Sequence, residues 1–106
     1  MSRDACDELR RKFVRSFMDL IVIRMLADKP LWGYKLMTTI KDVYDIKVGP
    51  SVIYPLLDGL EEAGFIEGSE EYDGKRRRKI YRTTPEGLEQ LECLGEILKE
   101  FSVSAP

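Results

Sequence analysis

The stretch GPSVIYPLLDGLEEAGFIEGSEEYDGKRRRKIYRTTPEG, residues 49–87, decides how this chain folds. Pro50 suits the first position of a helix, where a proline loses no hydrogen bond, and Gly64 suits the left-handed residue that follows a helix. These signals predict a helix over residues 50–63. Pro55 removes a backbone hydrogen bond inside that helix, and such departures from propensity concentrate at functional or closely packed positions.

A β-hairpin follows this helix. Asp73-Gly74 lies between two extended runs and predicts a hairpin over residues 65–83. If these two residues form the turn, the facing pairs are Tyr72–Lys75, Glu71–Arg76, Glu70–Arg77 and Ile66–Tyr81. The last pair is apolar, which supports this register and places Tyr81 in the core.

Helical patterns flank this stretch on both sides. Apolar residues recur at helical spacing, and Thr84 and Pro85 supply an N-cap and a first-turn proline for the last helix. The expected elements are helices over residues 9–27, 34–45, 50–63 and 84–101 and a hairpin over residues 65–83. This order indicates a mainly α fold with a β-hairpin wing (α+β), a single winged helix-turn-helix DNA-binding domain over residues 1–106.

Composition excludes several classes of protein. The 106 residues include no His and two distant cysteines, Cys6 and Cys93, which excludes a zinc site and His-dependent catalysis and predicts ordinary thiols. The sequence contains no phosphate-binding glycine loop and no apolar run of about 18 residues that could span a membrane. The first four residues lack the apolar part of a signal peptide. We therefore expect a cytoplasmic protein with no enzymatic activity, no cofactor and no membrane partner.

The net charge of −2 conceals a strong segregation of charge. Residues 75–82 contain six cations and no acid, whereas residues 65–74 carry four acids and no cation. Pairing across the hairpin would use two of these cations and leave Lys75, Arg78, Lys79 and Arg82 free. We therefore favour a wing that contacts phosphates. A second basic cluster, Arg10, Arg11, Lys12 and Arg15, is either a solvated helix face or a flanking DNA contact.

Four segments resemble the PadR-like family of winged-helix transcriptional regulators. They are LWGY (31–34), GPSVIYPLL (49–57), LEEAGFI (60–66) and RRRKIYRTTPEG (76–87). The resemblance covers about residues 19–98. It implies a dimeric repressor that binds double-stranded DNA, with the third helix in the major groove and the wing on the adjacent backbone.

The resemblance also implies which residues contact DNA. Carried over by position and extended along the basic run, they are Tyr34, Lys35, Ser51, Val52, Tyr54, Gly74, Lys75, Arg76, Arg77 and Arg78. The third helix departs from the family because it contains no Lys or Arg. Base reading would then depend on hydroxyl and thymine-methyl contacts. We expect Tyr54 to be exposed, and we interpret Trp32 as a packing residue.

Two apolar stripes exceed what a small core can cover. Leu91, Leu94, Leu98 and Phe101 follow the 3-4-3 spacing of a helix seam. With Leu9, Phe13 and Phe17 of the first helix they predict a two-fold homodimer interface, so the last helix is a C-terminal dimerisation helix. Some members of the family bind small phenolic or drug-like effectors in the dimer pore. Here the candidate lining, Phe13, Phe17, Leu94 and Phe101, does not differ from ordinary interface core.

A rival hypothesis comes from the acids of the third helix. Asp58, Glu61 and Glu62 give its C-terminal half a negative charge. The domain would then be a protein-interaction module that docks a basic partner through this helix. Salt-dependent binding to duplex DNA distinguishes the two hypotheses.

Overall fold

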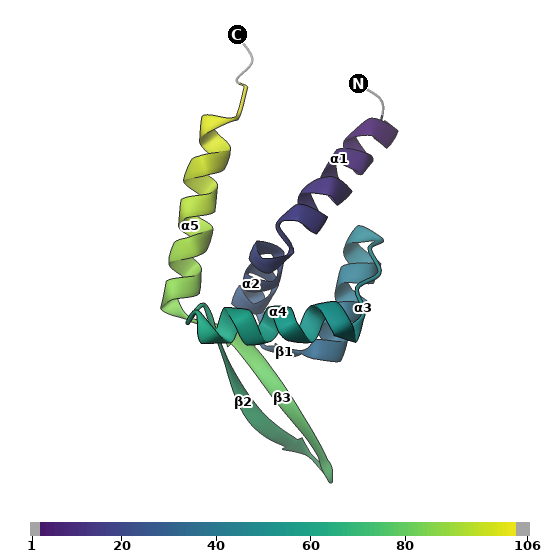
Figure 1. The fold of residues 1–106 in the computed structure, drawn as a ribbon, viewed down its shortest axis with the longest axis vertical. Helices are drawn as coiled ribbons and strands as arrows, with labels where there is room; N and C mark the ends of the chain where they lie inside the picture. The colour runs from purple at the N-terminus through teal and green to yellow at the C-terminus, as the bar shows by residue number, and fades with distance from the viewer. Residues whose placement is uncertain (1–2, 104–106) are drawn as a thin grey trace.

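The computed structural model describes residues 3–103, and this part of the chain forms five helices and a three-stranded antiparallel sheet whose hairpin projects from the helices (Figure 1). In chain order the elements are α1 (Arg3–Ser16), α2 (Met18–Asp28), β1 (Leu31–Trp32), α3 (Gly33–Tyr44), α4 (Pro50–Glu62), β2 (Ile66–Asp73), β3 (Arg76–Thr83) and α5 (Pro85–Glu100). The expected fold class is confirmed: the chain is mainly helical and carries a β-hairpin wing.

The core lies where α2, α3, α4 and the base of the hairpin meet. Its aliphatic side chains recur at helical spacing on each of the three helices, and their burial contributes roughly 1.5–3 kcal/mol each. The buried members of these helices are Val22, Ile23, Leu26, Leu36, Ile40, Ile53, Leu57 and Leu60. Ile66 and Tyr81 complete the core from the hairpin, so the expectation that Tyr81 is a core residue is confirmed.

The prediction of a single helix over residues 9–27 is wrong. This segment forms two helices, because the backbone at Phe17 leaves helical geometry, with φ −120° and ψ 39°. The second helix buries Val22, Ile23 and Leu26, whereas the first buries only Val14 among its described residues. The bend lets α2 pack into the core while α1 leaves it, and Figure 1 shows α1 pointing away from the body.

The structure adds a strand that sequence reasoning missed. Leu31 and Trp32 lie in the segment expected only to break the helix, and they pair with Tyr81 and Ile80 of β3. Two residues are too few to show an alternating pattern, so the pairing depends on β3 being available beside them. The sheet order is β1-β3-β2.

The register expected for the hairpin is also wrong, by two residues. The turn is Gly74-Lys75 rather than Asp73-Gly74, and Gly74 takes a φ of +65° that glycine adopts readily. The facing pairs include Asp73–Arg76, Tyr72–Arg77, Gly68–Tyr81 and Ile66–Thr83. Because side chains alternate with a period of two, this shift leaves Ile66 and Tyr81 on the expected face and changes only their partners.

A tight junction joins the wing to α5. Thr84 is the N-cap of α5: its Oγ1 accepts a hydrogen bond from the Gly87 N–H at 3.2 Å and donates one to the Gly64 carbonyl at 2.6 Å. A Cβ at Gly87 would lie 2.3 Å from the Phe65 carbonyl oxygen. Only glycine therefore fits this position without a backbone shift.

We expect Gly87→Ala to lower the free energy of unfolding by about 1–3 kcal/mol, because the added methyl group overlaps backbone. Gly59→Ala is the control, since a Cβ at that position of α4 meets nothing within 4 Å. It should raise stability by roughly 0.5–1 kcal/mol, as for other helical glycines. Urea unfolding at one fixed protein concentration measures both effects. Equal effects of the two substitutions would contradict the junction described above.

Candidate nucleic-acid interface

The N-terminal halves of α3 and α4 present side chains to solvent beside one another. Tyr34 is 65% exposed, Val52 is 56% exposed and Tyr54 is 44% exposed, while Lys35 and Ser51 are also exposed. The expectation that Tyr54 is exposed is therefore confirmed. The opposite face of α4 is buried in the core, which fixes the direction in which these side chains point.

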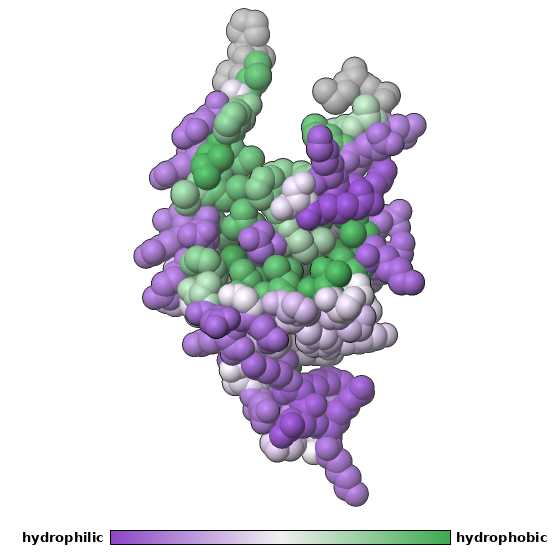
Figure 2. Space-filling model, in the orientation of Figure 1, coloured by the Kyte–Doolittle hydropathy of each residue, from purple (hydrophilic) through white to green (hydrophobic). Residues whose placement is uncertain are grey.

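The tip of the wing is exposed and basic. Gly74, Lys75, Arg76 and Arg77 are exposed and lie at the far end of the hairpin. Figure 2 shows mostly hydrophilic surface over the wing, at the lower end of the molecule. Three neighbouring cations on a projecting hairpin can approach a phosphate backbone without contact from the body of the domain.

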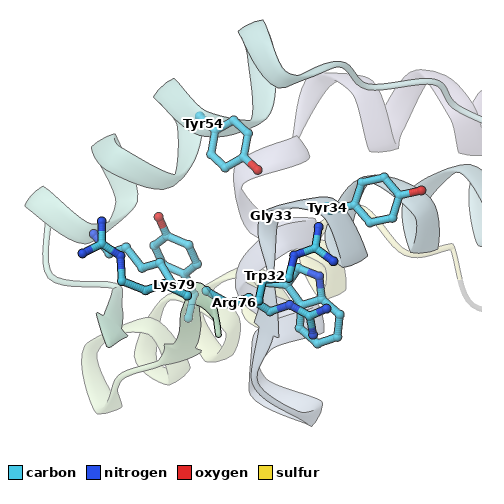
Figure 3. A pocket seen from close by; sticks show the side chains of 9 residues that line it. Trp32, Gly33, Tyr34, Tyr54, Arg76 and Lys79 are labelled. Atoms are coloured by element: carbon cyan, nitrogen blue, oxygen red, sulfur yellow. The ribbon is translucent and has the colours of Figure 1, made fainter. Parts of the chain in front are cut away.

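A cavity of about 410 Å³ lies between the wing and the start of α3 and α4. It is lined by Trp32, Gly33, Tyr34, Tyr54, Arg76, Arg77, Arg78, Lys79 and Tyr81 (Figure 3). The structure thus brings together five of the ten expected DNA-contacting residues, from three different elements. The other five, Lys35, Ser51, Val52, Gly74 and Lys75, lie outside this lining.

Close packing joins α4 to the start of α3 inside this cavity. Figure 3 shows Tyr54 projecting from α4 toward Gly33. A Cβ at Gly33 would lie 2.6 Å from Cε1 of the Tyr54 ring. The absence of a side chain at Gly33 therefore leaves the space that the Tyr54 ring occupies. The signal in the sequence was the glycine itself, because the start of a helix does not by itself require one.

Arg78 is held against the body of the domain. Its guanidinium carbon lies 4.4 Å from the centroid of the Trp32 ring, and its Nη1 lies 3.8 Å from Asp73 Oδ2. Cation–π contacts of this kind contribute roughly 0.5–2 kcal/mol, depending on exposure. Trp32 is half-buried, so it packs as expected but also supports a wing cation, a function that its position in the sequence did not indicate.

The expectation that Lys75, Arg78, Lys79 and Arg82 remain free is wrong for all of them except Lys75. Ion pairs hold Arg77 to Glu70 at 3.5 Å, Arg78 to Asp73 at 3.8 Å, Lys79 to Glu61 at 2.8 Å and Arg82 to Glu71 at 3.7 Å. The shifted register changes which side chains meet, and Glu61 lies outside the hairpin altogether. Among residues 3–103, Lys75 and Arg76 have no ion-pair partner. Exposed pairs contribute at most about 1 kcal/mol, so a phosphate can replace the weaker ones.

Glu61 has a more specific environment than the sequence indicated. Its carboxylate accepts hydrogen bonds from Lys79 Nζ at 2.8 Å and from the Gly68 N–H at 3.0 Å. The hydrogen bond from Lys79 lowers the pKa of Glu61, and the same bond raises the pKa of Lys79. Both groups are therefore charged at neutral pH. The pairing persists above the ordinary glutamate pKa and weakens as the pH falls through the lowered value.

The opposite end of the molecule has an apolar face between α1 and α5. A cavity of about 310 Å³ lies between α1 and α5, and its lining includes Phe13, Phe17, Leu94, Leu98 and Phe101. Phe101 is 76% exposed, and Figure 2 shows hydrophobic surface on the side of α5 that faces α1. Of the other expected interface residues, Leu91 packs against the core and Leu9 is exposed outside this lining. Exposed apolar clusters on a soluble domain are typical of interaction sites.

The basic cluster of α1 lies at this apolar end rather than at the wing (Figure 1). Arg10 stacks over the Tyr44 ring at 4.7 Å and donates a hydrogen bond to the Val43 carbonyl. It thereby ties α1 to the end of α3. Arg11, Lys12 and Arg15 line a shallow polar hollow on α1.

No helix within residues 3–103 combines the length and the apolar character needed to cross a membrane. In the same range, no group of three or more His, Cys, Asp or Glu side chains could hold a metal ion. Cys6 and Cys93 are free thiols on exposed positions.

Comparison with known proteins points to one family. Residues 22–93 match the family described as "Transcriptional regulator PadR-like family". The transcriptional regulator Rv3488 of Mycobacterium tuberculosis is 29% identical over 94 residues, which are 85% of this chain and 87% of that protein. The transcriptional regulator YqjI of Escherichia coli is 30% identical over 102 residues, and the chain spans about half of its length.

Solved structures agree with this match. A PadR family transcriptional regulator from Eggerthella lenta superposes with a TM-score of 0.70 at 28% identity, over 92% of this chain and 88% of that one. A PadR-like transcriptional regulator from Bacillus cereus gives a TM-score of 0.74 at 25% identity, over 85% of this chain and 88% of that one.

Trp32 is the single tryptophan of the chain, so its fluorescence reports on the base of the wing. We expect Arg78→Gln to increase quenching of Trp32 by acrylamide, because the ring loses the guanidinium that covers one face. Lys75→Gln removes the same charge at the wing tip and is the control. Identical quenching in the two variants would show that Arg78 does not cover the ring in solution.

Proposed function

The chain belongs to the PadR-like family of transcriptional regulators, and on that premise we propose that it is a homodimeric repressor that binds double-stranded promoter DNA. Regulators of this family bind DNA and commonly dimerise. The observation that carries the proposal is the meeting of three elements on one face: the starts of α3 and α4 and the basic wing, around the cavity of about 410 Å³. A protein of this kind acts on the chromosome, so we also propose a cytoplasmic location.

We propose that α4 reads bases in the major groove through its N-terminal half. Ser51 and Tyr54 carry hydroxyl groups, and Val52 offers methyl groups that fit a thymine methyl. This half of the helix is exposed and contains no cation. Asp58 and Glu62 are exposed on the C-terminal half, where their charge disfavours close approach of phosphates. The helix would therefore enter the groove by its first turns.

We propose that the wing supplies most of the contacts to phosphate. Lys75 and Arg76 have no ion-pair partner among the described residues, and Arg77 has one at 3.5 Å. Tyr34 lines the cavity, and Lys35 follows it in the first turn of α3. Both would contact the phosphate backbone of DNA between the two grooves. Arg78 would contribute charge from a fixed position on Trp32.

The alternative is a protein-interaction module that uses the acids of α4. One observation weakens it: Glu61 is already engaged by Lys79 and Gly68, so it offers little to a basic partner. A protein of this class would not bind duplex DNA with a steep dependence on salt.

We expect the triple variant Lys75→Gln, Arg76→Gln, Arg77→Gln to bind a selected duplex more weakly and to lower the salt slope by up to about 2.7. Each neutralised phosphate contributes roughly 0.9 to the log–log slope. Fluorescence anisotropy across a salt series, on a duplex recovered from a random-sequence pool, measures both quantities.

The matched control for the wing is Arg11→Gln, Lys12→Gln, Arg15→Gln, which removes three cations from α1. Because α1 and the wing lie at opposite ends of the molecule, we expect this variant to keep the wild-type slope. An unchanged slope in the wing variant would refute the wing assignment. A reduced slope in the α1 variant would establish the flanking DNA contact instead.

We propose that the apolar surfaces of α1 and α5 form the two-fold dimer interface. The supporting observation is that Phe13, Phe17, Leu94, Leu98 and Phe101 share one open apolar cavity. A second copy would cover this surface and place two wings on half-sites about one turn of DNA apart. If an effector regulates the protein, its expected place is this same cavity.

Leu98→Glu tests the interface, because it buries an unpaired charge in the dimer but lies on the surface of the single subunit. We expect the wild type to sediment as a dimer at micromolar concentration and the variant as a folded monomer. Glu96→Gln, on the same helix outside the cavity lining, should remain dimeric. A monomeric wild type would exclude the proposed interface.

A further inference from the structure

Glu61, near the end of α4, reaches across to both strands of the wing. Its Oε2 accepts the Gly68 N–H of β2 at 3.0 Å, and its Oε1 accepts Lys79 Nζ of β3 at 2.8 Å. The Glu61 side chain is only 31% exposed. One carboxylate therefore connects α4, the helix proposed to enter the major groove and called the recognition helix below, to both strands at the base of the hairpin. We call Glu61, Gly68 and Lys79 the helix–wing clamp.

The helix–wing clamp is closely packed. A Cβ at Gly68 would lie 2.5 Å from Lys79 Cε and 3.1 Å from Glu61 Oε2. Lys79 Nζ also lies 5.3 Å from the centroid of the buried Tyr81 ring. Because β2 is an edge strand of the sheet, its outward N–H groups have no neighbouring strand, and Glu61 supplies the missing acceptor at Gly68.

Beyond this clamp the hairpin has little support from the body. Residues 70–77 are all exposed, and Figure 1 shows the hairpin projecting from the domain. The contacts that orient it lie at its base. They include the clamp on the α4 side, the β1–β3 pairing with the Arg78–Trp32 contact, and the hydrogen bond from Thr83 Oγ1 to the Ile23 carbonyl of α2. A small rotation at the base therefore moves the tip cations by a much larger distance.

We propose that Glu61 is a positioning residue that sets the angle between the recognition helix and the wing. At this angle the cations of the wing tip meet phosphates while the start of α4 lies in the major groove. The inference rests on the proposed DNA-binding function and deepens it. Glu61 itself contacts no DNA and acts through Gly68 and Lys79.

The sign of the effect on DNA binding separates positioning from simple charge. Removing an acid from a DNA-binding domain reduces repulsion and strengthens binding. If Glu61 holds the wing, Glu61→Ala does the opposite: binding of the selected duplex weakens, and the salt slope falls by about 0.9 for each tip cation that loses its phosphate. This loss of slope occurs although no cation has been removed.

Two comparisons complete the binding test. Glu62→Ala makes the same charge change one residue away, on an exposed side chain with no ion pair among the described residues, and we expect unchanged or stronger binding. In the Lys75→Gln, Arg76→Gln, Arg77→Gln background, Glu61→Ala should cause no further loss. Stronger binding by Glu61→Ala, or a full additional loss in that background, would overturn the proposal.

A measurement without DNA tests the clamp independently of the proposed function. Residual dipolar couplings of the wing amides report their orientation relative to the body in the whole protein, as a monomer or a symmetric dimer. In the wild type we expect the couplings of wing and body amides to fit one alignment tensor. In Glu61→Ala the couplings of residues 69–80 should no longer fit the tensor of the body, while the couplings of the body amides stay unchanged. Unchanged wing couplings would overturn the clamp whether or not the protein binds DNA.

Failure of DNA binding and failure of a variant to fold have different consequences for the proposal. If the wild type shows no salt-dependent duplex binding, the proposed function fails, and the couplings alone decide whether Glu61 fixes the wing. If Glu61→Ala does not fold, Glu61→Gln replaces it in the coupling test. Its amide oxygen keeps an acceptor for the Gly68 N–H but the ion pair with Lys79 is lost, so we expect a smaller loss of shared alignment over residues 69–80, and unchanged couplings would overturn the clamp.

Discussion

Burial of one face of α4 is the constraint on which the rest of the molecule depends. Ile53, Leu57 and Leu60 fill the core between α2 and α3, so the helix cannot rotate without losing several kcal/mol of apolar burial. The same helical geometry turns Val52 and Tyr54 toward solvent. The surface proposed to read DNA is thus a direct consequence of core packing. Helix α4 also fixes the place of Glu61, which leaves its last turn toward the wing.

The distribution of wing cations follows from their surroundings rather than from their number. Six cations stand in eight residues, yet Arg78 stacks on Trp32 and Lys79 pairs with Glu61 close to the body, where both orient the hairpin. Lys75 and Arg76 lie beyond those attachments and have no ion pair among residues 3–103. The wing therefore combines a base that is held by charge and ring contacts with a tip whose charge is available to a partner.

Sequence reasoning succeeded where one local pattern dominates. The proline at the start of α4, the apolar spacing of α3 and α4 and the Thr84-Pro85 cap each act within a few residues, and the helices they predict are present. It failed where two local solutions have similar energy. Asp73-Gly74 and Gly74-Lys75 both make acceptable two-residue turns, and the chain adopts the one that gives Gly74 the first turn position. Likewise, a continuous apolar pattern could not reveal the bend at Phe17, which reflects how differently α1 and α2 are buried.

The sequence by itself determined the order of α3, α4, the hairpin and α5, the apolar faces of α3 and α4 that enter the core, and the concentration of positive charge on one strand of the hairpin. These properties depend on neighbours in the chain, through helical and strand periodicity. Only the tertiary structure decided which cations have partners, because Glu61 and Lys79 are 18 residues apart and Trp32 meets Arg78 through a strand pairing that no local pattern predicts. Contacts between distant residues depend on the packing of whole elements, and that packing turned an acid on α4 into a support for the wing.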